Sequence, residues 1–298
     1  GAWLVFLELT WVRFGWVFNL DYSFTLGQVI WAIGWSMIVL AGLIHFSTKT
    51  IAAAGISMIL LHNLFDNVTP HQLGIFGWTW QILHYGGGIV YSPGYRFEAA
   101  YPLIPWIGVM AAGYSFGSIL LLEESRRRKI LSLLGAGLIL FFIALRFSNI
   151  YGDHNSWKEQ KDFIFTILSF INVEKYPPSL LYLSITLGIT ILSLRVLEKA
   201  KGFFAKFFIT FGRVPMFYYL LHIPVIHGLA VITAIIAGAE YSFMFGNTPP
   251  WVWPGEWGFS LAIVYAFWIG IVILLYPICV WFGNVKSRHK GNRWLSYI

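Results

Sequence analysis

Ionisable side chains occur inside strongly apolar segments of this chain, where each needs a partner or a function. The stretch FGRVPMFYYLLHIPVIHG, Phe211–Gly228, contains one arginine, two prolines and two histidines in an otherwise apolar run. His222 and His227 are five positions apart and point about 140° away from each other on a helix, so they do not form a two-histidine metal face. An ionisable group in such a place is by default a candidate functional residue. We take His222 as a candidate catalytic residue, with a hydrogen bond to a neighbouring helix as the alternative.

Two short motifs place a carboxylate beside an imidazole. In HNLFD, His62 and Asp66 stand at an i, i+4 spacing, which puts them on one face of a helix. In YGDHNSW, Asp153 and His154 are neighbours. A carboxylate that orients an imidazole makes a general base, and each pair is a candidate for that role. A hydrogen-bonded structural pair is the alternative for each.

A cluster of cations precedes the helix expected to begin at Pro215. Proline suits the first turn of a helix, which puts Gly212 and Arg213 in the turn before it and Lys206 close by. Backbone N–H groups at a helix start, together with an arginine fork, favour binding of a phosphate. The alternative is a basic flank that touches lipid headgroups.

Motifs of ordinary soluble enzymes are missing from the sequence. It contains no Cys/His zinc pattern, no Gly-x-Ser-x-Gly elbow, no glycine-rich phosphate loop and no iron-ligand array, so no metal is expected. The single cysteine, Cys279, lies in an apolar run and is expected to pack there.

The elements that must position these residues are membrane-spanning helices. The chain has 298 residues, of which 58% are hydrophobic and 11% charged, whereas a soluble domain carries about 25% charged residues. We expect an all-α polytopic membrane protein forming a single domain over residues 1–298, with about eight spans, two of them short. The predicted spans are Ala2–Val17, Leu26–Phe46, Thr50–Phe65, Tyr101–Leu122, Lys129–Phe147, Ser179–Leu197, Pro215–Ile236 and Phe259–Phe282.

Basic residues gather in short connectors. The net charge of +7 comes largely from EESRRRK (Glu123–Lys129), RVLEKAKGFFAK (Arg195–Lys206) and the tail KSRHKGNR (Lys286–Arg293). Eight alternating spans place all three on one side, and short basic loops mark the cytoplasmic side. The C-terminus is therefore expected in the cytoplasm, and the positive charge does not indicate a nucleic-acid partner. The long loops at 66–100, 148–178 and 238–258 fall on the opposite side.

These long loops are too apolar to be plain connectors. FGWTWQILHYGGG (Phe76–Gly88) concentrates aromatic residues of the kind found at headgroup level and is expected to form a cap on the membrane. DFIFTILSFI (Asp162–Ile171) is too short to span and is expected to be interfacial or re-entrant. Glu8, Arg13 and Arg146 lie within predicted spans, so each is expected to face partners or a wet cavity.

Several longer stretches resemble one known family. LELTWVRFGWVFN (Leu7–Asn19), AYPLIPWIGVMAAGY (Ala100–Tyr114), YGDHNSW (Tyr151–Trp157), NVEKYPPSLLYLSITLG (Asn172–Gly188), the stretch at Phe211–Gly228 and the ending RWLSYI are similar to the bacterial branch of the heparan-alpha-glucosaminide N-acetyltransferase family, within the transmembrane acyltransferases. The resemblance runs the length of the chain. It implies an enzyme of the bacterial inner membrane that takes an acetyl or acyl group from cytoplasmic acyl-CoA and passes it to a sugar amine or hydroxyl on the far side.

The resemblance carries over unevenly to single residues. Family members begin with two further helices that bear an RG motif and the histidine to which acetyl transfer is usually assigned. This chain starts with Gly1 and an apolar run without a basic flank, so we expect preceding helices. Lys175 and His222 match family positions, whereas His154 stands where the bacterial pattern has proline.

The resemblance and the residue chemistry together give a set of roles. The CoA phosphates would bind at Lys206, Gly212 and Arg213, with the thioester reaching the depth of His222. On the acceptor side, Lys175 would bind the glycan or glycolipid, and the base would come from Asp66, His84, Asp153 and His154. Direct transfer and an acyl-histidine intermediate both remain open.

Two other classes of function fit the same features. A transporter shares buried charges and a proline-broken helix, but it usually has inverted internal symmetry, which is not seen in this sequence. A noncatalytic scaffold subunit of a membrane complex also fits, and a homo-oligomer is compatible with every reading. A histidine in a first loop ahead of Gly1 would favour the enzyme.

Overall fold

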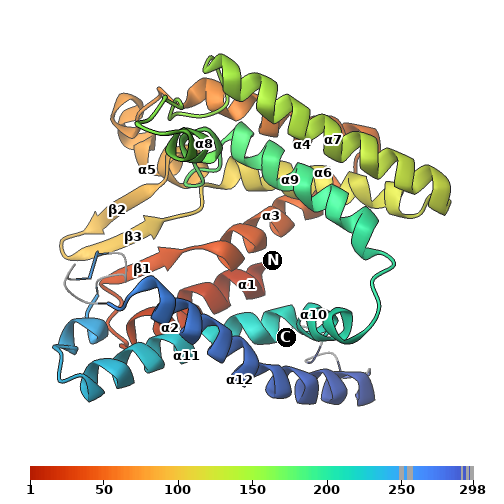
Figure 1. Cartoon of the computed structure of the whole chain (residues 1–298). Helices are drawn as coiled ribbons and strands as arrows, with labels where there is room; N and C mark the ends of the chain where they lie inside the picture. Colours follow the sequence, from red (N-terminus) through yellow and green to blue (C-terminus); the bar gives the residue numbers. More distant parts are fainter. Residues whose placement is uncertain (248–251, 254–257, 290, 293–294, 296–298) are drawn as a thin grey trace. The chain divides into compact units, whose positions relative to one another are not determined.

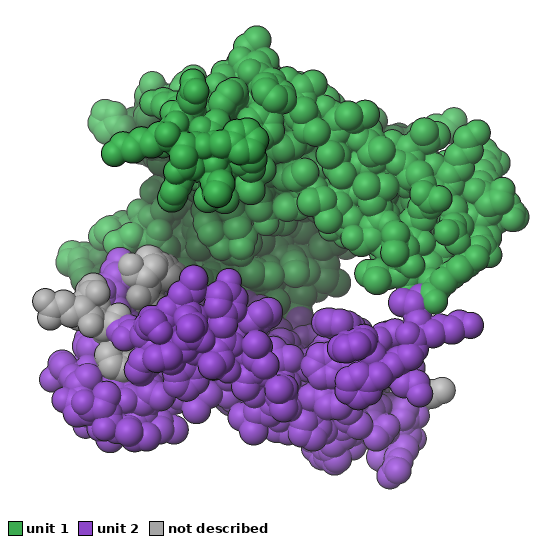
Figure 2. Space-filling model, viewed as in Figure 1, with its two compact units in different colours: residues 1–8, 25–199 green, residues 9–24, 200–298 purple. Residues whose placement is uncertain are grey.

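The computed structural model describes residues 1–247, 252–253, 258–289, 291–292 and 295, so most of the terminal RWLSYI lies outside it. The chain forms two compact units, residues 1–8 with 25–199 and residues 9–24 with 200–298 (Figure 2). Helices occupy all eight segments predicted to span. Six helices among the described residues are long and apolar enough to cross a membrane. The chain is therefore an all-α polytopic membrane protein, as predicted.

A π-helical turn interrupts the first predicted span. The segment runs as α1 (Ala2–Leu7), the π-helix η1 (Glu8–Val12) and α2 (Arg13–Val17). Glu8 is completely buried, and its Oε2 accepts hydrogen bonds from the backbone N–H groups of Ile30 and Trp31 at 3.1 and 3.2 Å. These are free N–H groups at the start of the next helix, α3 (Val29–Leu43), so the carboxylate caps that helix.

Close helix pairs in the first unit meet through glycine. In α4 (Thr48–Leu61) and α6 (Leu103–Leu120), a Cβ on Gly55 would lie 2.8 Å from the carbonyl oxygen of Gly108. In α7 (Glu124–Ser148) and α9 (Leu180–Leu197), the same contact joins a Cβ on Gly135 to the carbonyl of Gly188 at 3.0 Å. Small residues let helix backbones approach closely in lipid, where no hydrophobic effect drives association.

The loop between α4 and α6 contains a small sheet that was not predicted. After the 3₁₀ helices η2 (His62–Phe65) and η3 (Pro70–Phe76), the chain forms α5 (Gly77–Trp80), the π-helix η4 (Gln81–Tyr85) and strands β2 (Gly87–Ser92) and β3 (Tyr95–Ala99). The strands β2 and β3 pair antiparallel, and β1 (Phe24–Gly27) completes the order β1-β3-β2 (Figure 1). The sequence IVYSPGYRF carries the signal for this hairpin, a Pro-Gly turn between β-branched and aromatic residues.

Arg146 near the end of α7 organises the second long loop. Its guanidinium is 2% exposed and donates hydrogen bonds to the carbonyls of Phe170 (2.9 Å), Asn155 (2.7 Å), Ser169 (3.1 Å) and Asn172 (2.7 Å). Ser169 and Phe170 belong to the last turn of α8 (Phe163–Ile171), and Asn172 caps it, so the cation meets the negative end of the helix dipole. The predicted interfacial segment is this short helix, whose apolar side chains are largely exposed.

The second unit is built on α10 (Phe203–Arg213), α11 (Pro215–Ile236) and α12 (Leu261–Arg288), with the 3₁₀ helix η5 (Ser242–Phe245). Both α2 and α12 pack on α11. Arg13 is buried here as well, and it donates hydrogen bonds to backbone carbonyls of residues 19, 21 and 24 and to the side chain of Asn247. The partners predicted for this buried arginine are therefore mainly backbone oxygens.

Basic connectors of the first unit gather at one end of its helices. Arg127 pairs with Glu198, and Lys199 Nζ lies 2.6 Å from Glu124 Oε1, which joins the start of α7 to the end of α9. Ser115 Oγ donates to the carbonyl of Thr48 at 3.2 Å, which joins the end of α6 to the start of α4. The opposite ends of these helices carry the loops that contain Asp66, His84 and Asp153.

We predict that the two ends face opposite sides of the membrane. In a background with Cys279→Ala, Arg126→Cys and Ser156→Cys each place one exposed thiol, at the basic end and in the second long loop. A membrane-impermeant maleimide added to one side of sealed vesicles should label only one of the two, with Arg126→Cys labelled from the cytoplasmic side. Labelling of both variants from the same side would contradict this topology.

Candidate functional site

An aspartate and a histidine from different elements form a dyad in the first unit. Asp66 follows η2 at the end of α4, and His84 lies in the π-helix η4. His84 Nε2 is 3.2 Å from Asp66 Oδ1. The histidine side chain is 2% exposed and the aspartate 19%, so a nearly buried imidazole faces a carboxylate that reaches the surface.

The contact with Asp66 favours one tautomer of His84. An Nε2–H that points at the carboxylate 3.2 Å away leaves the lone pair of the neutral ring on Nδ1. Nδ1 has no hydrogen-bond partner among the residues that the structure describes. Trp80 packs on the ring, with centroids 4.8 Å apart. An oriented imidazole with a free lone pair is the arrangement of a general base, and π-helical turns are frequent at functional sites.

Asn63 holds the carboxylate from the other side. Its Nδ2 donates to Asp66 Oδ2 at 2.9 Å, and its Oδ1 accepts the backbone N–H of Leu180 at 2.8 Å. The side chain therefore connects the dyad to the first turn of α9. The sequence prediction did not include Asn63, although it stands inside the HNLFD motif.

The expected pairing of His62 with Asp66 is not what the structure contains. The α-helix ends at Leu61 and η2 is a 3₁₀ helix, so the i, i+4 register is lost between the two residues. The ring nitrogens of His62 face backbone carbonyls instead, Nδ1 that of Ile59 at 2.9 Å and Nε2 that of Pro178 at 2.9 Å. His62 therefore ties α4 to the start of α9, and Asp66 is left for His84.

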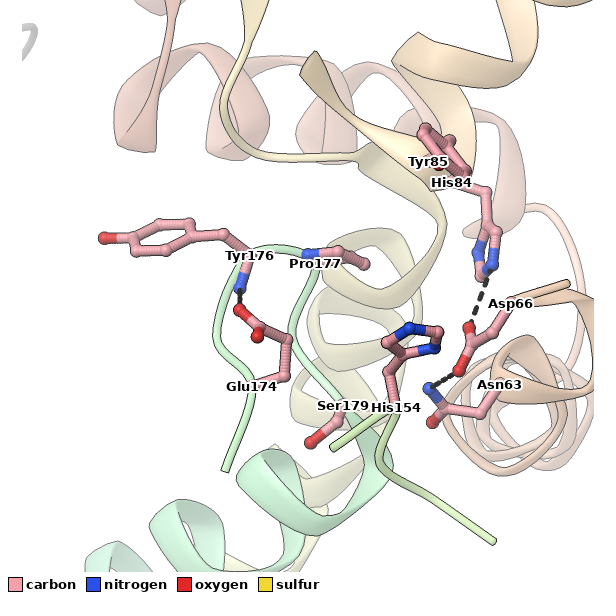
Figure 3. Close-up of a pocket in the computed structure, with 9 residues that line it drawn as sticks. All are labelled: Asn63, Asp66, His84, Tyr85, His154, Glu174, Tyr176, Pro177 and Ser179. Atoms are coloured by element: carbon pink, nitrogen blue, oxygen red, sulfur yellow. Dashed lines mark hydrogen bonds and ion pairs between the residues drawn. The ribbon is translucent and has the colours of Figure 1, made fainter. Parts of the chain in front are cut away.

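A pocket of about 270 Å³ opens beside the dyad. Figure 3 shows its lining side chains, with His84, Asp66 and Asn63 at one wall and His154 projecting into the middle of the view. His154 is exposed and makes no hydrogen bond with the residues that the structure describes. The remaining lining residues come from the loop before α9 and from the residue after His84: Tyr85, Glu174, Tyr176, Pro177 and Ser179.

Asp153 supports the pocket wall and is not free to act as a base. Its Oδ2 accepts the backbone N–H of Glu174 and the hydroxyl of Ser179, both at 2.8 Å, and its Oδ1 accepts the N–H of Asn155 at 2.8 Å. Arg146 Nη1 lies 3.8 Å from the same carboxylate. The predicted Asp153–His154 pair is thus a buried carboxylate that fixes the loop, with its neighbour exposed in the pocket.

Lys175 stands next to the pocket, on the same loop. Its Nζ lies 4.9 Å from the centre of the Tyr176 ring, and no carboxylate pairs with it among the described residues. Burial raises the pKa of the Tyr176 hydroxyl, but hydrogen bonds with Lys175 and Tyr101 and the charge of Lys175 lower it by more, so the net shift is downward. The ammonium group therefore faces phenol groups and an apolar cavity, described below.

The cations predicted to hold phosphate lie in the second unit. Gly212 and Arg213 form the last turn of α10 and not a loop, and Val214 alone separates them from α11. Lys206 is seven positions before Arg213, so the two cations share a face of α10. Arg213 also lines a hollow of about 270 Å³ together with Gly283, Lys286 and Ser287 of α12. Lys286 was not predicted as part of this site.

His222 and His227 make different contacts within α11. His222 Nδ1 donates to the carbonyl of Tyr219 in its own helix at 2.7 Å, which leaves the lone pair on Nε2. His227 Nδ1 donates to the carbonyl of Gly15 in α2 at 3.0 Å, and its ring stacks on Phe18. His227 therefore holds two helices together, whereas His222 does not bond to a neighbouring helix through Nδ1.

Pro224 leaves one carbonyl of α11 without its helical donor. Because proline has no N–H, the carbonyl of Leu220 is free, and the indole of Trp11 donates to it at 2.8 Å. This break in the helix is used for packing.

The comparisons with known proteins agree with this description. A family model described as heparan-alpha-glucosaminide N-acetyltransferase, catalytic, matches residues 1–151. No curated protein and no solved structure matches the chain. No group of three or more metal-ligating side chains occurs in the described part. The matched segment covers half of the chain and contains Asn63, Asp66 and His84. The chain therefore belongs to the heparan-alpha-glucosaminide N-acetyltransferase catalytic family.

Proposed function

We propose that the protein transfers an acetyl or acyl group from cytoplasmic acyl-CoA to an amine or hydroxyl of a sugar on the noncytoplasmic side of a bacterial inner membrane. The observation that supports this most is the Asp66–His84 dyad in an open pocket, in a chain of an acetyltransferase family. The pocket lies at the helix ends opposite the basic connectors. The distribution of positive charge supports assigning that end to the noncytoplasmic side.

The dyad supplies the proton transfer that acyl transfer requires. The acceptor's nitrogen or oxygen attacks the thioester carbonyl, and its proton passes to Nδ1 of His84. Asp66 stabilises the imidazolium that forms. The bond between carbon and sulfur then breaks, and the proton returns to the thiolate of CoA. A positioned base is typically worth a factor of about 10² or more.

Polar side chains across the pocket would recognise the acceptor. Glu174 and His154 line the same pocket as the dyad and offer hydrogen-bonding groups, as a sugar requires. His154 is exposed and unbonded, so it is the pocket residue that would carry the acyl group if transfer proceeds through an acyl-histidine. Lys175 would bind an anionic part of the acceptor.

The donor would bind through its phosphates in the second unit. Arg213 and Lys286 flank one hollow, and Lys206 extends the same positive face of α10. Arginine holds phosphate by charge-assisted hydrogen bonds. His222, with its free Nε2, is the catalytic candidate of the second unit.

Substitution in the dyad tests the role of the base. His84→Gln should lower the turnover of acyl transfer by at least ~10²-fold. Asp66→Asn should also lower it, because an amide can donate to Nε2 and shift the ring proton to Nδ1. Turnover is measured with acetyl-CoA and a glucosaminide acceptor in purified protein. His71→Gln, an exposed histidine of η3, is the matched control and should keep normal turnover; a His84→Gln protein with normal turnover would exclude the dyad.

Calorimetry tests the donor site separately. Arg213→Ala should weaken acetyl-CoA binding by about 1–3 kcal/mol, since it removes a charge-assisted hydrogen bond. Arg126→Ala removes an exposed arginine at the start of α7 and should leave the affinity unchanged. Equal affinity in both variants and the parent protein would remove Arg213 from the site.

The two histidines of α11 should respond differently to substitution. His222→Gln should reduce turnover by at least ~10²-fold with little change in thermal stability, because Nδ1 bonds only within its own helix. His227→Gln should lower the melting temperature but keep the turnover per folded molecule, because it loses a bond between helices, typically ~0.6 kcal/mol in membranes. If His222→Gln melts earlier and keeps its turnover, the residue is structural.

A further inference from the structure

A second, larger cavity lies in the first unit beside the dyad pocket. It measures about 620 Å³ and runs between α3 and α6. Its lining positions on α3 are 29, 32, 33, 36 and 40, which form one face of that helix. From Val29 to Leu40 the helix rises roughly 16 Å, about half of the hydrocarbon thickness of a bilayer. The cavity extends along α3 and its lining is mostly apolar, which fits a hydrocarbon chain.

The cavity has a cation at one end. Lys175 lines it together with Tyr101 and Tyr182, at the helix ends where the dyad pocket also lies. Lys175 has no carboxylate partner among the residues described. A lysine in an apolar setting is costly unless an anion accompanies it. A negatively charged group on the occupant of this cavity would pair with Lys175.

Two buried polar groups inside the cavity lack partners. The hydroxyl of Ser36, on a residue 1% exposed, and the indole nitrogen of Trp106 make no hydrogen bond with the described residues. Both can donate, and an unpaired buried donor costs free energy. The ester carbonyl oxygens at the glycerol end of an acyl lipid can accept hydrogen bonds from such donors, which a pure hydrocarbon cannot do.

Neighbouring residues connect the two cavities. Lys175 lines the apolar cavity, and Tyr176, the next residue, lines the dyad pocket. The hydroxyls of Tyr101 and Tyr176 lie 3.3 Å apart, so these side chains meet where the cavities adjoin. A molecule with an acyl chain, a phosphate and a sugar in that order would place them in the apolar cavity, at Lys175 and beside His84.

We propose that the acceptor is a sugar-bearing phospholipid, whose acyl chain occupies the cavity between α3 and α6 and whose phosphate binds Lys175. This rests on the proposed function only in naming the sugar as acceptor. The lipid site itself requires no acyl transfer and can be tested without a donor.

Photo-crosslinking in nanodiscs tests the site. The probe is phosphatidylinositol with a diazirine in one acyl chain, and diacylglycerol with the same chain, which lacks the phosphate, is the control. Mass spectrometry should locate phosphatidylinositol adducts on peptides of α3 and α6, at least about tenfold above those of diacylglycerol, because a charge-assisted contact contributes at least that factor. Equal labelling by both lipids would mean that only surrounding bilayer lipid is detected, and would overturn the proposal.

Two pairs of variants locate the site. A Cβ at Gly113 meets nothing within 4 Å, so Gly113→Leu should fill the cavity without a clash and abolish the adducts. Gly117 is the matched control: a Cβ there also meets nothing within 4 Å, but the residue does not line the cavity, so Gly117→Leu should keep the adducts. Lys175→Gln should lower labelling by phosphatidylinositol to the level of diacylglycerol, and Lys175→Arg should retain it. Labelling unchanged in Gly113→Leu or in Lys175→Gln would overturn the proposal.

The donor's own chain is the competing occupant. A long-chain acyl-CoA with the same diazirine should not label α3 and α6 or displace phosphatidylinositol from them; if it does, the cavity holds the donor and the proposal is wrong. His84→Gln should keep the lipid adducts, because the dyad is not needed for lipid binding. The lipid adducts could depend on Gly113 and Lys175 while the protein transfers no acyl group. That result would support the lipid site and refute only the proposed function.

Discussion

The need to satisfy polar groups away from water governs the architecture of this chain. In lipid, an unpaired N–H, carbonyl or charge costs several kcal/mol, so buried charges persist only with partners inside the protein. Arg146 shows the consequence. Its guanidinium binds three carbonyls at the end of α8 and the carbonyl of Asn155, and it approaches Asp153, which in turn binds Ser179 and the backbone of Glu174. One buried cation thereby fixes the loop that forms a wall of the candidate site.

Composition and charge were sufficient to predict the class of fold. The apolar runs predicted the helices. Glu8, Arg13 and Arg146 were each expected to need a partner. Glu8 binds the start of a helix, Arg13 binds carbonyls of the first loop and Arg146 binds α8. The partners could not be predicted, because they are mainly backbone groups. Any residue can supply a backbone carbonyl, so no pattern of side chains marks it in advance.

The dyad was only half predictable, for a geometric reason. Asp66 and His84 were both candidates, but spacing paired Asp66 with His62, since a continuous helix would align them. The 3₁₀ turn at His62 and the π turn at His84 change the direction in which each of these two side chains points. Such turns depend on tertiary contacts, including the bond from His62 to the carbonyl of Pro178, and these link segments more than a hundred positions apart.

The family match covers one part of the candidate site and ends before the other part. Asn63, Asp66 and His84 fall within residues 1–151, whereas His154, Lys175 and Ser179 follow it. Under the proposed function, the shared segment would contain the groups that move a proton, a step common to every acyl transfer. The later segment would contain the groups that face the acceptor, and these would change when the acceptor changes. A fold can keep its chemistry and vary its substrate in this way, because recognition resides in the side chains placed around a constant base.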